Sequence, residues 1–335
     1  MSTQVLTRPP ELQTSRRPHS RERDSGRSIA RLSRLGQVVL GLIWLIDGIL
    51  QFQPYMFGKT FVTGVILPNA TGQPGIIAAP ITWIANLIEP HMTAFNAFAA
   101  TLQVLIGLGL LYRRTVKPAL LVSFVWAIGI WFSGEGLGLI FTGTASPLTG
   151  APGAALLYVI AGLICWPRER GAAAAGLIGE RGARFAWAAI WLGSAALWLL
   201  PANDSSNGVH DAIAAVPTGA GWLTQLLSSA ATATAGRGTE IAIVMAIVSA
   251  TIGVGVLRNR HAKPLLVTAI VISLVYWVFG QALGGVFTGQ ATDVNAAPLM
   301  ILIASLLLAL QPAAALASAR TRAASRSGAR EVLAR

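Results

Sequence analysis

Apolar and polar residues follow one another along this chain in long blocks and not in the short alternation of a half-buried strand. Eight continuous apolar runs cover residues 35–53, 91–112, 117–133, 151–167, 184–200, 239–257, 264–280 and 298–316. A helix needs about 20 apolar residues to cross a hydrocarbon core of about 30 Å. The pattern therefore predicts an all-α integral membrane protein with eight transmembrane helices. A membrane β-barrel is excluded because its strands alternate in short segments.

Composition agrees with this fold class. Hydrophobic residues make up 54% of the 335 residues and charged residues 11%, and the mean hydropathy is +0.62. A soluble domain carries about 25% charged residues. The lipid bilayer is thus the expected surrounding of most of the chain.

The basic residues indicate the orientation. Of the 25 Lys and Arg residues, 23 lie in five segments: before the first run, after the second, fourth and sixth runs, and after the last one. The positive-inside rule places these segments, and both termini, in the cytoplasm. The net charge of +12 then reflects topology, and no nucleic-acid-binding element is visible. The excess of Arg over Lys, with abundant Ala and Gly, is typical of a GC-rich genome, so we expect a bacterial plasma (inner) membrane.

The chain contains an internal repeat. Residues 113–152 align with residues 259–298 at a constant offset of 146, and residues 44–54 align more weakly with residues 191–201. Positions shared by both copies include Lys117/Lys263, Trp131/Trp277, Gly134/Gly280, Phe141/Phe287, Thr142/Thr288, Gly143/Gly289 and Pro152/Pro298. Four helices per unit is an even number, so the two units, 31–167 and 184–316, are predicted to be parallel repeats.

Three segments lie outside the predicted repeats. Residues 1–30 are polar and basic, and we expect a disordered cytoplasmic leader. Residues 168–183 form a cytoplasmic linker, and residues 317–335 a basic cytoplasmic tail. Two further apolar stretches, 75–90 and 220–230, are too short to span, and we expect them to lie in the outer interface or to re-enter as short helices.

Asp47 is the residue with the highest insertion cost. It lies inside the first run, where a charged side chain costs about 2.5 to 3.5 kcal/mol near the centre of the membrane. It is either solvated at the outer interface, bonded to a neighbouring helix, or functional. Gln51 is one turn further along the same helix face. The aligned residues of the second copy are Ser194 and Trp198, so the second copy has lost the acid.

The glycine-rich loop SGEGLGLIFTGTAS after the third run is the second candidate site. Glu135 in this loop aligns with Gln281, and a hydroxyl recurs at Thr142 and Thr288. The loop is either a tight re-entrant turn packed under Trp131 or Trp277, or a ligand or ion site that uses Glu135. Asp293 reads most simply as a cap of the last helix.

Enzymatic and metal chemistry have little support in the sequence. There is no nucleophile–base pair and no nucleotide signature, and the four histidines lie outside the apolar runs. The single cysteine, Cys165, excludes a redox-active pair within the chain. We expect a non-enzymatic protein with no metal and no cofactor.

The start of the first unit, RLGQVVLGLIWLIDGILQF, followed by a polar outer loop and three more runs, resembles the four-span DoxX-like membrane family. That family includes the small subunit of a terminal quinol oxidase. The resemblance implies a tandem fusion over residues 30–316 and a redox accessory role near quinone, in a membrane redox complex.

The sequence thus favours a transport or small-ligand or ion-binding function, with an outward-facing site between the repeats. The alternatives are a DoxX-like redox accessory subunit and a scaffold subunit of a membrane complex. The predicted ligand- or ion-binding residues are Asp47, Gln51, Trp131, Glu135, Thr142, Trp277, Gln281 and Thr288.

Overall fold

The computed structural model describes residues 18–167 and 175–310, and within these ranges it is helical and contains no strand. The first 17 residues of the predicted leader, residues 168–174 of the predicted linker, the predicted tail and the end of the eighth predicted span lie outside the described residues.

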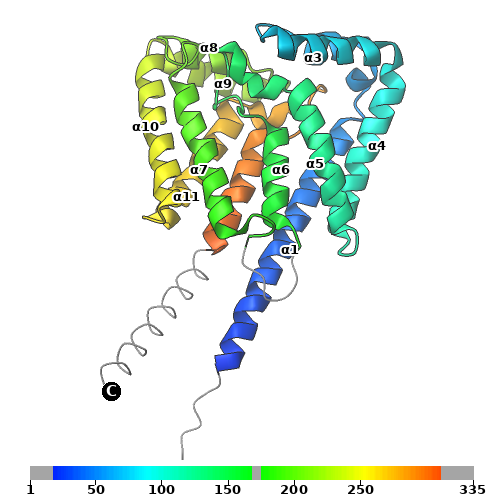
Figure 1. Cartoon of the computed structure of the whole chain (residues 1–335). Coiled ribbons are helices and arrows are strands. Elements are labelled where there is room, and N and C mark those ends of the chain that lie inside the picture. Colours follow the sequence, from blue (N-terminus) through cyan, green and yellow to red (C-terminus); the bar gives the residue numbers. More distant parts are fainter. Residues whose placement is uncertain (1–17, 168–174, 311–335) are drawn as a thin grey trace, which may run out of the picture.

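Among the described residues, eight helices occupy the eight apolar runs. They lie side by side in a bundle (Figure 1). They are α1 (Pro18–Leu50), α4 (Met92–Leu111), α5 (Val116–Ser133), α6 (Ala154–Cys165), α7 (Gly179–Trp198), α10 (Gly238–Leu257), α11 (Ala262–Phe279) and a final helix, Ala296–Leu310. The first residues of α1 and the end of the final helix lie at the same end of the bundle.

Among the described residues, five helical segments are long and apolar enough to cross a membrane. They are Ala30–Leu50, Gly75–Leu111, Val116–Thr142, Gly238–Leu257 and Ala262–Phe279. The helix α6 and the final helix are apolar but shorter. The helix α7 has 20 residues, but its first turns carry Glu180, Arg181 and Arg184, which lower its hydropathy.

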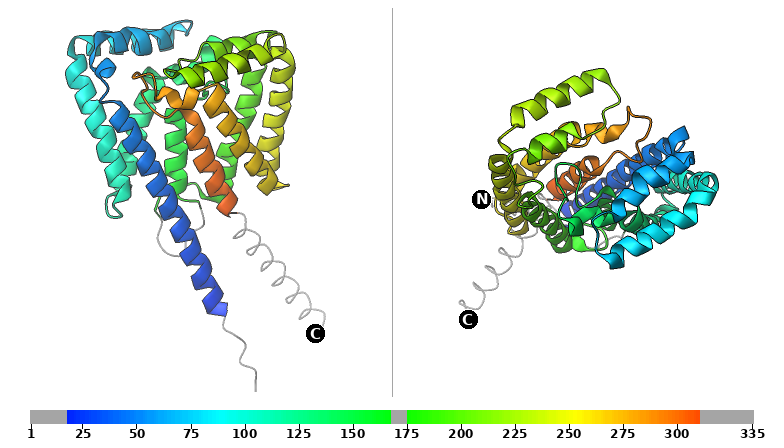
Figure 2. Two further views of the ribbon diagram at one scale, coloured as in Figure 1. Left: turned by 180° about the vertical axis from the view of Figure 1, so that it is seen from behind. Right: turned by 90° about the horizontal axis from the view of Figure 1, so that it is seen from above.

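Short helices cover the opposite end of the bundle. The helices α3 (Gly75–Ile88), α8 (Gly208–Ala214) and α9 (Gly221–Thr234) lie across the long helices (Figure 1). Seen along the bundle, α3 and α9 lie at opposite edges (Figure 2). The two apolar stretches that we predicted to be too short to span, 75–90 and 220–230, are therefore short helices. The chain bends between α3 and α4 at the turn η4 (Glu89–His91).

Between α1 and α3 the chain forms four short turns. They are η1 (Pro54–Phe57), α2 (Lys59–Phe61), η2 (Val62–Ile66) and η3 (Leu67–Ala70). Apolar side chains of these turns pack with the inner face of α3 in one cluster that includes Met56, Ile66, Ile77 and Ile81. This cluster holds α3 over the ends of α1, α4 and α5.

The helix α1 begins earlier than its apolar run. Its first residue is Pro18, so residues 18–30, which we expected to be disordered, are helical. Adding a residue to an existing helix forms one backbone hydrogen bond without a new nucleus, which favours such an extension. Further along α1, the Arg34 guanidinium donates to the carbonyl oxygens of Leu110 (2.9 Å) and Leu111 and so satisfies the end of α4.

Glycines bring α1 and α4 into close contact. A Cβ atom added at Gly107 of α4 would lie 2.6 Å from Leu45 Cγ and 2.8 Å from the carbonyl oxygen of Gly41. Small residues at such a crossing allow two backbones to approach, which is a main source of helix association in lipid. The pair α1–α4 forms one wall of the cavity described below.

The two aligned segments contain equivalent turns. The turns η5 (Gly136–Thr142) and η6 (Ala282–Gly285) place Leu137 and Leu283 in the left-handed region, with φ of 57° and 58°. The glycine-rich loops are thus tight turns at the end of the bundle that carries α3 and α9. The same local backbone recurs although the loops differ in sequence.

The alignment of the two segments shifts after these turns. The indole N–H of Trp131 donates to the carbonyl oxygen of Pro152 (2.7 Å), whereas Trp277 donates to that of Val294 (2.9 Å). The next helices begin at Ala154 and Ala296, which are 142 residues apart and not 146. Pro152 therefore corresponds to Val294, and the ungapped pairing with Pro298 was wrong because the first loop is four residues longer.

Replacing Gly107 by Val should lower the free energy of unfolding by about 1 to 3 kcal/mol, because the new side chain overlaps Leu45 and the α1 backbone. Unfolding of the purified protein in mixed micelles, followed by circular dichroism, would measure the change. Gly193→Val on α7 is the matched control, since a Cβ there meets nothing within 4 Å. Equal stability of the two variants would contradict this packing.

Candidate functional site

A cavity of about 320 Å³ lies in the first half of the molecule, between α1, α4, α5 and α6 and under α3. Most of its wall is apolar, with aromatic side chains that include Phe95, Trp126 and Phe132. Its size falls within the range of pockets that hold small organic ligands. Thr292 and Asp293 also line it, so both halves of the chain contribute to the cavity.

Asp47 lies in the last turn of α1 and lines this cavity with only 2% of its surface exposed. The hydroxyl of Tyr158 on α6 donates to Oδ2, and the backbone N–H of Val294 donates to Oδ1 at 3.1 Å. Solvation at the outer interface, one alternative from the sequence, does not describe this residue. The carboxyl group instead joins α1 to α6 and to the loop before the final helix.

Gln51 lies one turn beyond Asp47 and lines the same cavity. The side-chain amide nitrogen of Gln51 donates to the backbone carbonyl oxygen of Thr292 (3.0 Å). The backbone carbonyl oxygen of Gln51 accepts from the side-chain amide of Asn96 on α4 (2.7 Å). These bonds fix the end of α1 against α4 and against the second half of the chain. They place Gln51 and Asn96 at the polar end of the cavity.

Glu135 follows α5 and binds the start of α6. Its two carboxyl oxygens accept from the backbone N–H of Ala155 at 3.1 and 3.3 Å. The aligned residue Gln281 does the same for the final helix, because its Oε1 accepts from the N–H of Ala297 at 3.1 Å. Both side chains satisfy a backbone donor that the first turn of a helix leaves free. Glu135 lines the large cavity and brings a second carboxyl group to it.

Asp293 is the third carboxyl group of the cavity wall. Its oxygens accept from the N–H of Asn295 (2.6 Å) and from the hydroxyl of Thr292 (2.7 Å), while Asn295 Oδ1 accepts from the N–H of Ala296 at the helix start. Asn295 therefore caps the start of the final helix, and Asp293 holds the turn that precedes it. Together, Asp47, Glu135 and Asp293 place three carboxyl groups in the wall of this one cavity.

None of these three carboxyl groups forms an ion pair within the part of the chain that the structure describes. The ion pairs found there join Lys59 to Glu89, Arg184 to Glu180, and His210 to Asp211. No lysine or arginine lines the cavity. In the described ranges, no group of three or more His, Cys, Asp or Glu residues is arranged to hold a metal ion.

Among the residues that the structure describes, the side-chain amide of Gln103 on α4 has no hydrogen-bond partner and borders the cavity. Its side chain lines the cavity with 4% of its surface exposed, two turns along α4 from Asn96. An unpaired amide in an apolar region costs about 1 to 3 kcal/mol. A group of this kind is ready to bond to a molecule in the cavity.

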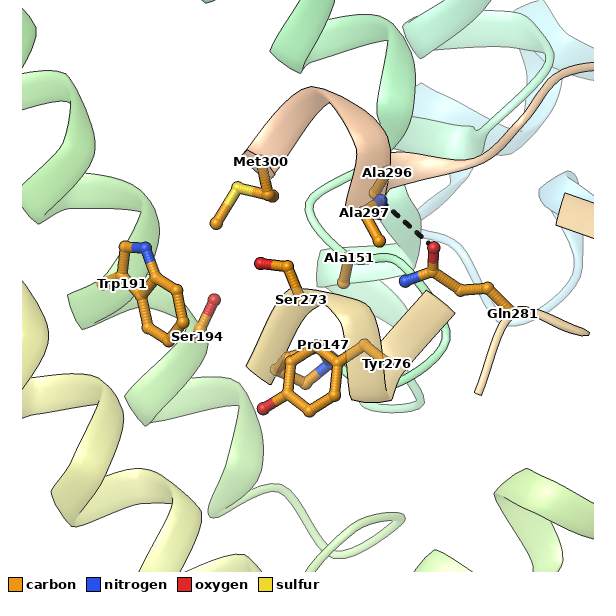
Figure 3. Close-up of a pocket in the computed structure, with 10 residues that line it drawn as sticks. All are labelled: Pro147, Ala151, Trp191, Ser194, Ser273, Tyr276, Gln281, Ala296, Ala297 and Met300. Atoms are coloured by element: carbon orange, nitrogen blue, oxygen red, sulfur yellow. Dashed lines mark hydrogen bonds between the residues drawn. The ribbon is translucent and has the colours of Figure 1, made fainter. Parts of the chain in front are cut away.

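The second half contains a smaller counterpart of this cavity, with a volume of about 20 Å³ (Figure 3). Trp191 and Ser194 of α7 stand where Trp44 and Asp47 stand in the first half, and Gln281 stands where Glu135 does. Met300 replaces Tyr158, since each is the fifth residue of its helix. The hydrogen bond from Ala297 to Gln281 is drawn in Figure 3.

The other predicted site residues line neither cavity. Trp131 and Trp277 use their indole N–H groups to bind the loops ahead of the next helices, as described above. The hydroxyls of Thr142 and Thr288 donate to the carbonyl oxygens of Leu139 (2.8 Å) and Gly285 (2.7 Å) within their own turns. Their recurrence in both halves reflects the turns, because each side chain is used to hold one.

The sequence prediction of ligand-binding residues missed several polar residues of the cavity, including Asn96, Gln103, Tyr158 and Asp293. The first two offered a signal, because two amides seven residues apart in an apolar run share one helix face and need partners there. Tyr158 offered none, since a tyrosine in a transmembrane helix is common.

Tyr158→Phe should lower the free energy of unfolding by about 1 to 3 kcal/mol, because the buried Asp47 carboxyl group loses a donor. Asp47→Asn in the same background should add less than its effect alone, since the two groups form one interaction. Unfolding of the two single variants and the double variant in micelles gives the coupling energy. Strict additivity would show that the two side chains act independently.

Comparison with known proteins adds no relative from which a function could be transferred. No family model, no curated protein and no solved structure matches this chain. The resemblance to DoxX-like proteins therefore stays a prediction.

Proposed function

We propose that the chain is an eight-span protein of the bacterial plasma membrane, built from two parallel repeats (31–167 and 184–316) with both termini in the cytoplasm. The basic turns support this orientation: Arg113 and Arg114 join α4 to α5, and Arg258 to Lys263 join α10 to α11. Both turns lie at the end of the bundle opposite α3 and α9 (Figure 1). The helices α6 and Ala296–Leu310, which are apolar but shorter, would also be spans.

The proposed function is to bind, and to carry across the membrane, a small amphiphilic ligand with a positively charged head group. The observation that carries this proposal is the large cavity, whose apolar walls end in three carboxyl groups without a basic partner. Carboxylates in an apolar setting need a cation, a proton or several donors. A ligand that brings an ammonium group supplies both charge and donors.

Head and body of such a ligand would meet different parts of the wall. Asp47, Glu135 and Asp293 would receive the head, and the amide of Gln103 would bond to a polar atom further along. Phe95, Trp126 and Phe132 would surround the apolar body. Aromatic faces also attract cations, which adds to the preference for a positive charge.

The hydrogen bonds of Asp47 suggest how ligand binding would move one half of the protein against the other. This carboxyl group joins α1 to Tyr158 in its own half and to Val294 in the other half. A cationic head group that competes for Asp47 would weaken the contact between the halves. Transporters built from repeats place their sites at such contacts, where one half moves against the other.

A redox accessory role near quinone is the second candidate. The cavity favours it in one respect, because a flat quinone ring suits aromatic walls and the Gln103 amide can donate to a quinone carbonyl oxygen. Under this role a short-chain quinone would bind, and neutral head groups would bind as well as cationic ones. A scaffold subunit would bind none of these compounds.

The charge preference is tested with three probes that share one apolar body: phenylbutylamine, phenylbutanol and phenylbutyrate. Calorimetric titration of the purified protein in lipid nanodiscs should show binding of the amine, weaker binding of the alcohol and none of the carboxylate. Asp47→Asn and Glu135→Gln should each weaken amine binding about 10- to 100-fold, the loss expected for a charge-assisted hydrogen bond.

Glu240→Gln is the matched control, because this acid is exposed at the same end of the bundle and lies outside the cavity. It should leave amine binding unchanged. Equal binding of the amine and the carboxylate, or no effect of either cavity variant, would overturn the proposal. Preferential binding of a short-chain quinone would favour the redox role.

A further inference from the structure

The large cavity has an opening on the side of the bundle. Gly129, on α5, lines the cavity and is also exposed, and a Cβ atom added there would meet nothing within 4 Å. It lies one turn before the end of α5 at Ser133. The missing side chain therefore leaves a gap at this level.

The position of Gly129 on its helix shows where the gap leads. Its neighbour Ile128 is 54% exposed, and Val125, which lies on the same face of α5 one turn earlier, is also largely exposed. Its other neighbour, Ile130, lines the cavity. Gly129 therefore lies on the edge of α5 between the outward face and the cavity. In a membrane-spanning helix, the outward face meets lipid chains.

Aromatic side chains frame the cavity near this edge. Trp126, one turn before Gly129, packs against Phe95 and Phe98 of α4 with ring centroids 6.5 and 6.0 Å apart. Phe95 and Trp126 line the cavity, and Phe98 is 57% exposed. The seam between α4 and α5 is thus apolar from the outward face to the cavity.

The second half has no such gap. The residue aligned with Gly129 is Val275, which is 46% exposed and does not line the small cavity. The half that carries Asp47 and Glu135 is also the half that has the opening. The gap therefore accompanies the ligand-binding features and is not common to both halves.

We propose that the ligand of the large cavity is a single-tailed lipophilic amine that enters from the bilayer between α4 and α5 at Gly129. Its ammonium head lies toward Asp47, Glu135 and Asp293, and its alkyl tail passes out by Gly129 into the lipid. This inference rests on the proposed function, and it adds the class of ligand and the side from which it comes.

The experiment compares two amines in lipid nanodiscs. Phenylbutylamine is short enough to lie inside the cavity, whereas the tail of dodecylamine has to pass the opening. Gly129→Leu should weaken dodecylamine binding at least about tenfold, because the leucine side chain would occupy the space through which the tail has to pass. Binding of phenylbutylamine at equilibrium should stay within about twofold, which also shows that the variant is folded.

Gly193→Leu is the control, since this glycine is likewise exposed, helical and without neighbours within 4 Å, but lies on α7 away from the cavity. It should bind both amines like the parent. If the parent binds phenylbutylamine but Gly129→Leu leaves dodecylamine binding unchanged, the lateral route is wrong and the proposed function stands. If the parent binds neither amine, the proposed function fails and the route fails with it.

A second variant covers the case in which leucine prevents folding. In Gly129→Cys a small thiol sits at the opening, and the natural Cys165 is buried. Dodecylamine should slow alkylation of this thiol by a membrane-soluble maleimide at least about threefold, whereas phenylbutylamine should not. Equal rates with and without dodecylamine would overturn the proposal.

Discussion

The carboxyl group of Asp47 is the interaction on which the arrangement of the two halves depends. A buried acid in a membrane helix is stable only when its oxygens have donors. Here one donor, Tyr158, comes from α6 and the other, the N–H of Val294, comes from the loop before the final helix. One side chain therefore connects three elements that are more than a hundred residues apart, and it fixes the loop that also carries Asp293.

A second set of contacts holds the same region and explains the shape of the cavity. Gln51 and Asn96 fasten the end of α1, while Glu135 and Gln281 each satisfy the first turn of the helix that follows their own. The glycine contact between α1 and α4 brings those two backbones together. With their ends fixed, the helices leave space under α3 that their side chains do not fill.

The two cavities show how the halves have diverged. At corresponding positions, Asp47 is replaced by Ser194, Glu135 by Gln281 and Tyr158 by Met300, and the cavity of the second half is much smaller, about 20 Å³ against about 320 Å³. The turns and the indole bonds of Trp131 and Trp277 are kept in both. The shared features thus hold the backbone, and the features that differ line the two cavities.

The sequence by itself determined the helical class, the positions of the eight bundle helices, the short helices across one end, and the choice of Asp47, Gln51 and Glu135 as candidates, all three of which line the large cavity. These follow from local properties, because an apolar run favours a helix in lipid whatever its neighbours are, and an acid within such a run needs a partner in any arrangement of helices. Residues 18–30 show the limit, since a polar sequence became helical by extending α1. Only the tertiary structure decided that Tyr158, Gln103 and Asp293 share one cavity, that Thr142 and Trp131 do not, and that Gly129 opens it. Those facts depend on which helix faces meet, and the contacts that set the faces join residues far apart in the chain.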